Sequence, residues 1–492
     1  TLWTAKAALV IIMLNSFNKR SSRDAALSST PSSTSSPPVF MRTVRVRKAG
    51  LTSTPNDATL ATGVARPVPT QQQSLAPDSL GWSLLLAARV LAAVGSGKSL
   101  SEALAVLAKE PPAARAAAQD VAYGVLRRYA WGEFILARLL SRALTHAETQ
   151  SLLLGALYRL ETRPEATPMV VDQAVAAAGE LAGGVFKGLV NGVLRNFLRQ
   201  RESLLAALAA DEEARYQHPR WWLARLRRAH RDHWLSIVAA GNSPPPMTLR
   251  VNRRRGTVAD YLARLEAAGI PARALGAAGV LLQNPVSVEA LPGFFDGFVS
   301  VQDAGAQRAA ELLAPTPGSR VLDACAAPGG KTAHLLETAP LDLLALDIDA
   351  GRTKRIEENL QRLGLCAKVQ VADCRQIEQW WDSRPFDAIL ADVPCSASGV
   401  LRRHPDIKHL RRESDIRRFA HTQAALLDAL WPLLKPGGKL LYATCSVFPE
   451  ENAAQIDAFL VRQPGVERLL EEQLLPQDEN DGFYYALLRK TA

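Results

Sequence analysis

Two cysteines are the residues of this chain whose types and spacing could do covalent chemistry. Cys395 lies in Asp-Val-Pro-Cys-Ser and Cys445 in Ala-Thr-Cys-Ser, and each follows an apolar run that predicts a buried strand, Phe386–Val393 and Lys439–Tyr442. A thiol at the carboxyl end of a parallel strand faces the crevice where open α/β sheets bind ligands. Two thiols in one crevice favour nucleophilic chemistry, because the thiolate is a strong nucleophile. The alternative is two small buried hydrophobic side chains.

A Gly-rich turn follows an earlier strand-like run of the same region. It reads Asp-Ala-Cys-Ala-Ala-Pro-Gly-Gly-Lys-Thr, from Asp323 to Thr332. Small residues let the backbone approach a ligand closely, and the glycine pair allows a tight turn into a helix. The turn is neither G-x-G-x-x-G nor a P-loop, which disfavours a dinucleotide or ATP. The candidate cofactor-binding residues of this turn are Cys325, Ala326, Ala327, Pro328, Gly329, Gly330 and Lys331.

Acidic residues end the neighbouring strand-like runs. Asp347 comes 18 residues after Gly329, where a carboxylate can accept hydrogen bonds from ribose hydroxyls. Asp373 and Asp392 end the next two runs, and Asp373 is expected to meet the adenine or the amino group of the cofactor. Such acids suit a ligand with a ribose, an amine and a sulfonium, and would repel a polyphosphate. Alternatively, each Asp caps the helix that follows it.

The elements that must position these residues belong to an α/β unit. From Val299 onward, apolar strand-like runs alternate with helical stretches, which indicates a parallel sheet with crossover helices. The expected strands are 320–325, 341–348, 368–372, 386–393 and 439–443, with a closing apolar pair that ends in 482–489.

A helical domain is predicted before this unit. From Trp82 to Arg201 the chain is rich in Ala and Leu at helical spacing. Breaks at Pro111-Pro112, at Pro164 and at Gly183-Gly184 divide it into several helices.

A connector dense in Arg and aromatic residues follows, between residues 215 and 234. Guanidinium groups bind phosphates bidentately, and aromatic rings stack on unpaired bases. For Trp221 and Trp222 the favoured interpretation is a helix whose Trp and Leu face the core while Arg faces water. The candidate RNA-binding residues are the arginines that come shortly after it, Arg250, Arg253, Arg254 and Arg255.

Composition narrows the class of protein. A chain of 492 residues with 48% hydrophobic and 22% charged residues predicts two or three ordinary globular domains. Its five cysteines form no C-x-x-C pair, which argues against a disulfide framework or a metal site and for a reduced, cytoplasmic protein. Of the net charge of +10, +6 lies in residues 1–80, so whole-chain charge is weak evidence for nucleic-acid binding.

The first eighty residues are expected to be a disordered extension. Ser21 to Pro77 is rich in Ser, Thr, Pro and Gln and cannot bury enough apolar surface to fold. The short apolar run from Ala7 to Leu14 could be a signal peptide, but it is too short to span a bilayer. The preferred interpretation is a translation start placed too far upstream, with Met41 as the real start.

Two groups of motifs resemble known families. The run Phe186–Arg195, with Tyr-Arg-Leu upstream at 158–160, resembles the NusB family of RNA-binding helical domains. The Asp323–Thr332 turn, together with Asp-Val-Pro-Cys-Ser and the run Ala443–Asn452, resembles the RNA 5-methylcytosine methyltransferases of the NOL1/NOP2/Sun family. The resemblance covers Trp82 to Arg489. It implies a Rossmann-like S-adenosylmethionine-dependent methyltransferase domain, preceded by an all-α NusB-like domain and a small basic connector domain.

The resemblance also implies roles for single residues. Cys445 would be the nucleophile that adds to carbon 6 of a cytosine, Cys395 would assist product release, and Asp392 would bind the cytosine edge. Lys331 would support the cofactor or its neighbouring carboxylates. The implied cofactor is S-adenosylmethionine, and the implied partner is 16S ribosomal RNA, methylated at cytosine 967 while free or in an early assembly intermediate. The chain would act as a monomer without membrane contact.

The expected domains are 1–80 as the extension, 81–215 as NusB-like, 216–298 as the basic connector and 299–492 as catalytic. One alternative is the same reaction at another ribosomal cytosine or in transfer RNA. A second is a non-catalytic RNA-binding protein, which the intact Cys395, Cys445 and Asp392 disfavour. A third is a small-molecule methyltransferase, which the helical domain and the Arg-rich connector disfavour.

Overall fold

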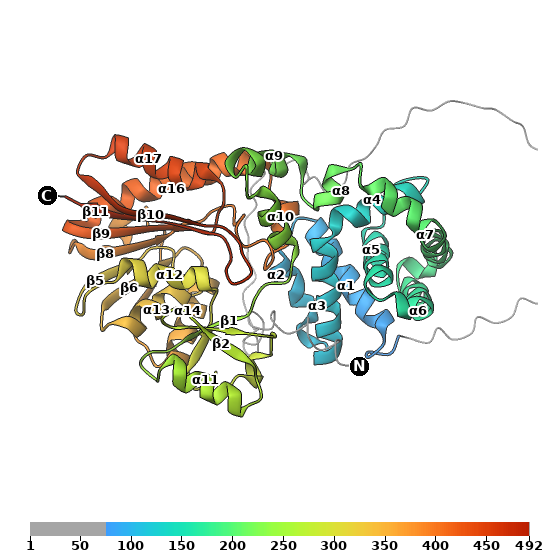
Figure 1. Ribbon diagram of the computed structural model, residues 1–492, viewed down its shortest axis with the longest axis horizontal. Coiled ribbons are helices and arrows are strands. Elements are labelled where there is room, and N and C mark those ends of the chain that lie inside the picture. The colour runs from blue at the N-terminus through green and yellow to red at the C-terminus, as the bar shows by residue number, and fades with distance from the viewer. Residues whose placement is uncertain (1–74, 492) are drawn as a thin grey trace, which may run out of the picture.

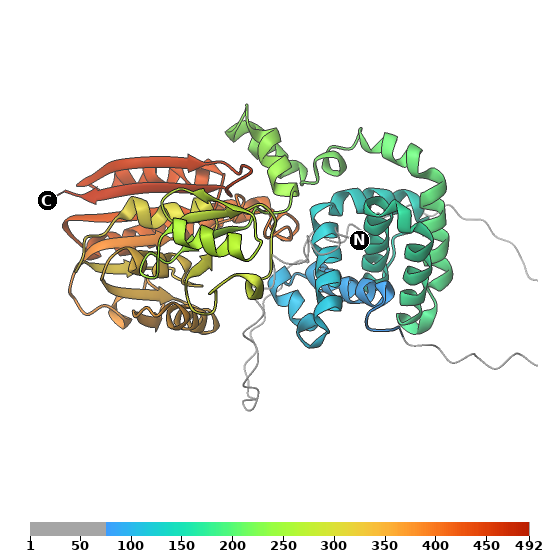
Figure 2. The same cartoon turned by 60° about the horizontal axis from the view of Figure 1, so that its bottom comes forward.

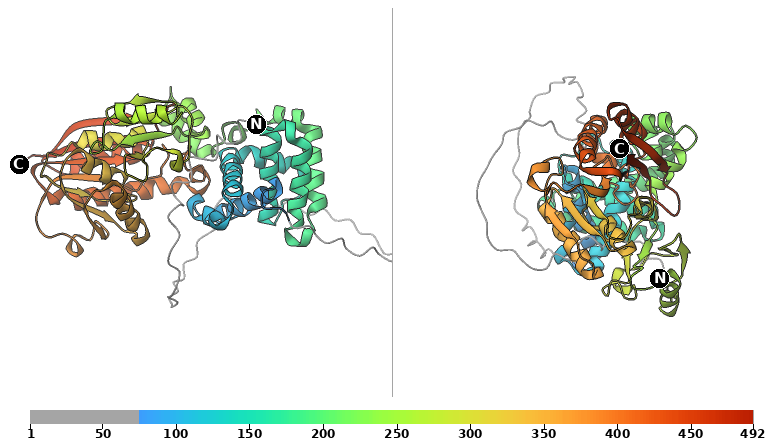
Figure 3. Two further views of the ribbon diagram at one scale, coloured as in Figure 1. Left: turned by 90° about the horizontal axis from the view of Figure 1, so that it is seen from below. Right: turned by 90° about the vertical axis from the view of Figure 1, so that its left-hand side faces the viewer.

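The computed structural model describes residues 75–491 as an elongated molecule. A helical unit occupies one end and an α/β unit the other, as the views in Figures 1 and 3 agree. Within the described range, no helix is long and apolar enough to cross a membrane. The predictions for the leader lie, up to residue 74, outside the described residues.

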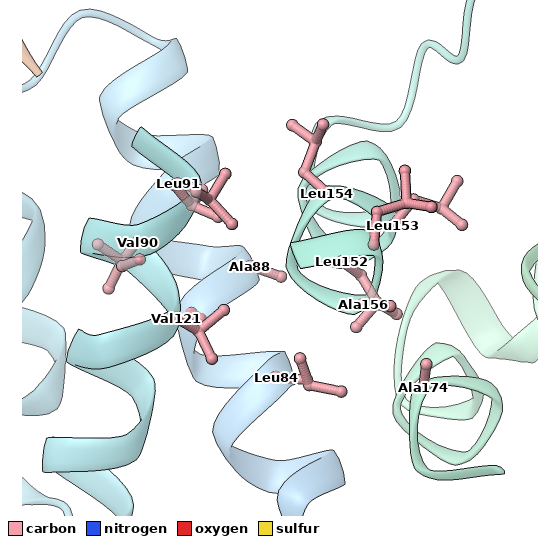
Figure 4. Packing of buried hydrophobic residues seen from close by; sticks show 14 of the residues in the cluster. Leu84, Ala88, Val90, Leu91, Val121, Leu152, Leu153, Leu154, Ala156 and Ala174 are labelled. Atoms are coloured by element: carbon pink, nitrogen blue, oxygen red, sulfur yellow. The ribbon is translucent and has the colours of Figure 1, made fainter. Parts of the chain in front are cut away.

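The helical unit is built around four helices that share one hydrophobic core. Helix α1 (Leu80–Gly95) packs against α3 (Pro112–Arg127), α5 (Ala147–Thr162) and α6 (Thr167–Gly179). Figure 4 shows Leu84 and Ala88 of α1 close to side chains of α3 and α5. The other elements are α2 (Leu100–Ala103), η2 (Leu104–Lys109), α4 (Tyr129–Leu139), η3 (Pro164–Ala166), η4 (Ala182–Gly184), α7 (Lys187–Leu208) and α8 (Glu212–Tyr216).

The predicted helix breaks coincide with the observed ones. Pro111 is the N-cap of α3, and Pro164 begins the single turn η3. Gly183 adopts φ 65°, which interrupts the helical path between α6 and α7 because this backbone region favours glycine.

Two connector helices, α9 (Arg220–Ala229) and α10 (Trp234–Asn242), pack against the α/β unit. Trp222 of α9 is fully buried in a cluster with Val447 and Phe448, which follow the Cys445 motif. Trp221 is partly buried in the same cluster. The aromatic residues of the connector therefore serve packing, as the amphipathic pattern of this segment predicts.

A small antiparallel sheet comes next, in the strand order β2-β3-β1-β4. Its strand β4 pairs with β1 through Leu249 and Val301, so residues 299–301 belong to this sheet and not to the catalytic sheet. We therefore propose that the catalytic unit starts after Val301, three residues later than expected. The elements are β1 (Thr248–Val251), α11 (Val258–Ala267), β2 (Ala272–Leu275), β3 (Gly279–Leu282), η5 (Val288–Ala290) and β4 (Val299–Val301).

The catalytic unit contains a seven-stranded sheet in the order β10-β11-β9-β8-β5-β6-β7. Strands β5 to β9 run parallel to one another. Strand β11 pairs antiparallel with β9, and β10 pairs antiparallel with β11, so these two strands lie along one edge of the sheet (Figure 2). Two hydrophobic clusters cover the sheet, one of which contains Val321 and the other Leu322. The strands are β5 (Arg320–Asp323), β6 (Asp342–Asp347), β7 (Lys368–Val371), β8 (Phe386–Asp392), β9 (Leu434–Thr444), β10 (Val466–Leu474) and β11 (Phe483–Lys490).

Helices cover both faces of this sheet, as expected for a doubly wound fold. The order of the strands reverses between β5 and β8, and this switch point marks where such sheets bind ligands. The remaining elements are α12 (Ala304–Leu313), α13 (Gly330–Thr338), α14 (Ala350–Leu363), η6 (Ile377–Gln379), α15 (Ile407–Leu410), α16 (Glu413–Leu430), η7 (Trp431–Leu433), η8 (Pro449–Glu451) and α17 (Ala453–Arg462). The predicted α/β fold with a preceding all-α unit is confirmed.

Polar contacts around α15 join the helical unit to the catalytic unit. The Lys408 ammonium is fully buried and donates to the Arg127 carbonyl at 3.0 Å and to Asn242 Oδ1 at 2.9 Å. The Asp406 carboxylate accepts from the Leu100 amide at 2.9 Å. Because these groups are satisfied only across the junction, they fix how the two units meet.

We predict that Lys408→Met removes a pH-dependent contribution to stability. Burial, with a smaller effect of Arg127, lowers the pKa of Lys408 to about 7, below the 10.5 of an exposed lysine. Between these values the unfolded chain binds a proton that the folded protein does not, so this group makes folding more favourable as pH rises, by about 1.4 kcal/mol per pH unit. The melting-temperature difference, wild type minus variant, should therefore increase from pH 7 to pH 9. A constant difference would contradict the prediction.

Candidate active site

The two motif cysteines meet at the carboxyl ends of adjacent parallel strands. Strand β8 pairs with β9, and Asp392 lies opposite Ala443. Each strand then continues for two or three residues to its cysteine, which places Cys395 Sγ 3.3 Å from Cys445 Sγ. Cys395 is buried and Cys445 is partly exposed. The hydrogen bond between the thiols, and burial, raise the pKa of Cys395 well above its usual value, so Cys395 is held as the neutral thiol.

The buried carboxylate of Glu451 connects the two cysteine loops. It accepts hydrogen bonds from the Ser396 amide at 2.7 Å, from Ser396 Oγ at 2.5 Å and from Ser446 Oγ at 2.6 Å. These serines directly follow Cys395 and Cys445 in the chain. Burial raises the pKa of Glu451, although its hydrogen-bond donors oppose this effect. Sequence reasoning assigned no role to Glu451, and the only signal was its place in the Pro-Glu-Glu-Asn run.

A second pair of charges lies beside the thiols. Lys331 Nζ is 2.6 Å from Asp392 Oδ2, with side chains 13% and 30% exposed. Burial disfavours the charge on Lys331, but Asp392 outweighs this effect and the pKa of Lys331 is raised. Cys445 also raises the pKa of Lys331 electrostatically, so the two side chains interact.

The Gly-rich turn forms a close-fitting loop between β5 and α13. The Ala326 amide donates to the Leu346 carbonyl at 2.8 Å, and the peptide bond between Ala327 and Pro328 is cis. Gly329 adopts φ 94°, and a Cβ there would lie 3.1 Å from the backbone of Ile356. The left-handed backbone favours glycine at this position, and the absence of a side chain lets the loop pack closely against α14.

Helix α14 holds the outer side of this loop. Asn359 Nδ2 donates to the Pro328 carbonyl at 3.0 Å, and Arg352 Nη2 donates to the Ala327 carbonyl at 2.8 Å. The Ala327 amide donates to Asp347 Oδ2 at 3.1 Å, so the acid that ends β6 also orders the loop.

The structure brings together the acids predicted at the strand ends. Asp347 is buried with 3% exposure, and Asp373 is held by the Arg375 guanidinium, which lowers the pKa of Asp373. Asp323 is fully buried, and burial raises its pKa to about 7. Its Oδ2 accepts from Thr332 Oγ1 at 2.7 Å, whereas its Oδ1 has no hydrogen-bond partner among the described residues.

These donors and acceptors fit S-adenosylmethionine. The ligand offers ribose hydroxyls, an ammonium and a sulfonium, all of which are complementary to carboxylates. The acids lie next to this loop, and Asp323 Oδ1 is a buried acceptor in need of a donor.

The structure corrects one predicted RNA-binding residue. Arg250 is 0% exposed and forms an ion pair with Glu337, so its guanidinium cannot reach a phosphate. Arg253, Arg254 and Arg255 are exposed, and their assignment to RNA binding stays a prediction. Arg253 lines a surface cavity with His334 and Thr338 of α13, and the Arg255 guanidinium lies beside Gly364, which follows α14. Thr338 is at the opposite end of α13 from the cofactor loop.

Part of the basic connector is also used within the protein. The Arg225 guanidinium, 10% exposed, pairs with Glu413 and Glu450, which joins α9 to α16 and η8. Arg227 pairs with Glu212. Exposed arginines such as Arg220, Arg228 and Arg231 are the ones left to face a partner.

We predict that Glu451→Ala loosens the arrangement of the two thiols. Truncation leaves the Ser396 amide and two serine hydroxyls without their acceptor, and buried unsatisfied groups cost about 1–3 kcal/mol each. We expect the free energy of unfolding to fall by about 2–4 kcal/mol. Asp457→Ala, which removes an exposed carboxylate from the next helix, should change it by less than about 1 kcal/mol. Chemical denaturation of both variants measures this, and equal effects would contradict the prediction.

Comparison with known proteins assigns each part of the chain. Residues 83–199 match the NusB family, residues 218–289 match a ferredoxin-like domain of RsmF/B-like methyltransferases, and residues 310–489 match the 16S rRNA methyltransferase RsmB/F. The region that contains most of the small sheet thus matches a separate ferredoxin-like domain of this family.

Curated relatives match over most of their length. The chain is 46% identical to Ribosomal RNA small subunit methyltransferase B of Pseudomonas syringae pv. tomato, over 83% of this chain and 97% of the relative. It is 45% identical to the protein of the same name from Vibrio cholerae, over 81% and 94%. Among solved structures, PH0851 is 23% identical with a TM-score of 0.71, covering 85% of this chain and all of that one, which supports the fold.

These matches confirm the predicted fold class, the NusB-like domain and the reaction class, an S-adenosylmethionine-dependent RNA (cytosine-5-)methyltransferase. The carboxylates and the glycine loop described above fit that cofactor. The chain belongs to the RsmB/F family of 16S rRNA methyltransferases.

Proposed function

We propose that this chain methylates carbon 5 of cytosine 967 in 16S ribosomal RNA through a covalent adduct between Cys445 and carbon 6. The observation that carries the proposal is the 3.3 Å separation of Cys445 Sγ and Cys395 Sγ at the sheet edge where the cofactor loop lies. One thiol can attack while the other stays within hydrogen-bond distance of it.

Cys445 is the proposed nucleophile. It is the more exposed of the two cysteines, and the Lys331 ammonium interacts with it electrostatically. Addition of the Cys445 sulfur to carbon 6 forms an S–C bond and moves electron density to carbon 5, which is otherwise a poor nucleophile. When bound, S-adenosylmethionine would supply the methyl group that carbon 5 takes, and S-adenosylhomocysteine would leave with the electron pair of the broken S–CH3 bond. The proton then leaves carbon 5 to water, and the S–C bond breaks with its electron pair on sulfur.

Cys395 is proposed to assist this last step. Its raised pKa keeps the thiol protonated, so the S–H group can donate to the Cys445 thiolate as that thiolate departs. Stabilising the leaving group speeds the breakdown of the adduct.

Asp392 and Lys331 are proposed to act together. Lys331 fixes the Asp392 carboxylate from one side through the 2.6 Å contact, and Asp392 Oδ1 is available to accept from the cytosine edge. The ring takes a proton at N3 from water as the S–C bond forms and returns it as that bond breaks, and a carboxylate at this edge stabilises the protonated ring by accepting from its N–H.

The proposed cofactor residues are those of the loop from Cys325 to Lys331, with Asp347, Asp373 and Asp392 as acceptors. Asp347 is assigned to the ribose hydroxyls and Asp373 to the adenine or the amino group. Asp323, with its unpartnered Oδ1, joins this set on structural grounds.

The proposed substrate follows from the relatives, whose names assign them to small-subunit ribosomal RNA. The target base must be unpaired or swung out to reach the thiols, which favours RNA that is free or in an early assembly intermediate. We further propose that the protein acts as a monomer in the cytoplasm. Labelled S-adenosylmethionine with naked ribosomal RNA, followed by mapping of the modified nucleotide, tests the target and separates it from another ribosomal cytosine or transfer RNA.

Replacing the two cysteines should block the reaction at different steps. Cys445→Ala should abolish methyl transfer, because no adduct forms. Cys395→Ala should accumulate a protein–RNA adduct that survives denaturant and appears as a shifted band on a denaturing gel. Cys366→Ala removes an exposed thiol outside the site and should leave activity unchanged. Retained activity in Cys445→Ala would overturn the nucleophile assignment.

The exposed arginines after β1 should contribute to RNA affinity. Replacing Arg253, Arg254 and Arg255 by Gln should weaken binding and reduce the slope of log affinity against log salt by about 0.7–0.9 for each phosphate that is no longer neutralised. The matched control replaces Arg462, Arg468 and Arg489, three arginines near the opposite edge of the sheet, and removes equal charge. Filter binding over a salt series measures both slopes. Identical slopes for the two triple variants would remove these residues from the RNA-binding surface.

A further inference from the structure

Arg250 is the centre of a buried polar network that no catalytic role explains. Its guanidinium binds the Glu337 carboxylate bidentately, Nε to Oε2 at 2.8 Å and Nη2 to Oε1 at 2.7 Å. Nη1 donates to Gln302 Oε1 at 2.5 Å and to the Gly330 carbonyl at 2.8 Å. Side-chain exposure is 0% for Arg250 and 1% for Glu337.

The network joins two units of the protein. Arg250 lies on β1 of the small sheet, and Gln302 directly follows β4 of the same sheet. Gly330 and Glu337 belong to α13, the helix that begins at the cofactor loop. The contact with the Gly330 carbonyl is therefore made to the residue next to Gly329, the glycine whose left-handed backbone shapes the loop.

These hydrogen bonds restrict how the small sheet can move relative to α13. A planar guanidinium with four bonds to three partners fixes direction as well as distance. Moving the small sheet relative to α13 would break charge-assisted hydrogen bonds inside the protein, where unpaired groups are costly. The Gly330 carbonyl is thus held from outside α13 by a residue of the small sheet.

A second arginine joins the same two units at another point. Arg362 of α14 donates from Nη1 to the Phe294 carbonyl at 2.7 Å and to the Val299 carbonyl at 2.9 Å, and from Nη2 to Ser300 Oγ at 3.1 Å. None of these acceptors belongs to the cofactor loop. A variant of Arg362 therefore measures how much attachment of the small sheet contributes to cofactor affinity without a direct bond to the cofactor loop.

We propose that Arg250 is a positioning residue for S-adenosylmethionine: it ties the small sheet to the Gly330 carbonyl and so sets the shape of the cofactor loop. The inference rests on the proposed assignment of residues 325–331 to the cofactor. It makes cofactor affinity depend on the position of a unit that lies outside the methyltransferase sheet.

The test compares Arg250→Lys with Arg362→Lys in the full-length protein. Lysine keeps the charge but offers one ammonium in place of the fork, so it cannot hold Glu337, Gln302 and Gly330 together. Isothermal titration with S-adenosylhomocysteine should show an affinity about tenfold lower for Arg250→Lys and within about twofold of wild type for Arg362→Lys. Steady-state kinetics should show the Arg250→Lys effect in the KM for S-adenosylmethionine and not in the KM for RNA.

Glu337→Gln supplies a second variant that keeps Arg250 in contact with Gln302 and Gly330. It should lower the S-adenosylhomocysteine affinity by less than Arg250→Lys does. Equal loss of affinity in the Arg250 and Arg362 variants, or a loss in melting temperature with unchanged affinity, would overturn the positioning role. Failure of the wild-type protein to bind S-adenosylhomocysteine would instead refute the proposed function, and this inference with it.

Discussion

The parallel pairing of β8 with β9 is the interaction on which the candidate chemistry depends. Because Asp392 lies opposite Ala443, each strand delivers its cysteine to the same point at the carboxyl edge of the sheet. A slip of one residue would send the side chains of one strand to the opposite face and separate the thiols. Glu451 then holds the two loops beyond the strands, where the ladder can no longer do so. Strand register and one buried carboxylate together set the distance between the sulfur atoms.

Charged groups around the site are buried only where they fix geometry. Glu451, the Lys331–Asp392 pair and the Arg250–Glu337 pair each lie in surroundings that disfavour charge, and each is held by short hydrogen bonds. A buried ion pair adds little net stability, because desolvation offsets much of the attraction. What such a pair does provide is a defined direction for every donor and acceptor. Glu451 and the Lys331–Asp392 pair use this at the ends of strands, and the Arg250–Glu337 pair uses it between a strand and a helix of different units.

Sequence reasoning succeeded where local pattern determines position. Apolar runs predict parallel strands, and residues just after such runs must gather at one edge, so Cys395, Cys445 and the acids could be placed together. Arg250 shows where local sequence pattern is not sufficient to predict a contact. It was grouped with exposed arginines because its neighbours in sequence are basic, yet its partner Glu337 lies 87 residues away. Its position within the apolar strand Thr-Leu-Arg-Val was the signal for burial, but no local spacing identifies a partner at that distance.

Ion pairs within the protein reduce the number of arginines that can bind RNA. Arg250, Arg402 and Arg403 are paired with buried carboxylates, and the last two share Asp481, whereas Arg225 pairs with the exposed Glu450. Charge that is paired inside the protein cannot release counterions from RNA. Affinity for phosphate must therefore come from exposed basic residues, among which Arg253, Arg254 and Arg255 after β1 are the proposed ones. Selection of one cytosine then falls to the shape of the site, because the thiols accept only a base that leaves its stack.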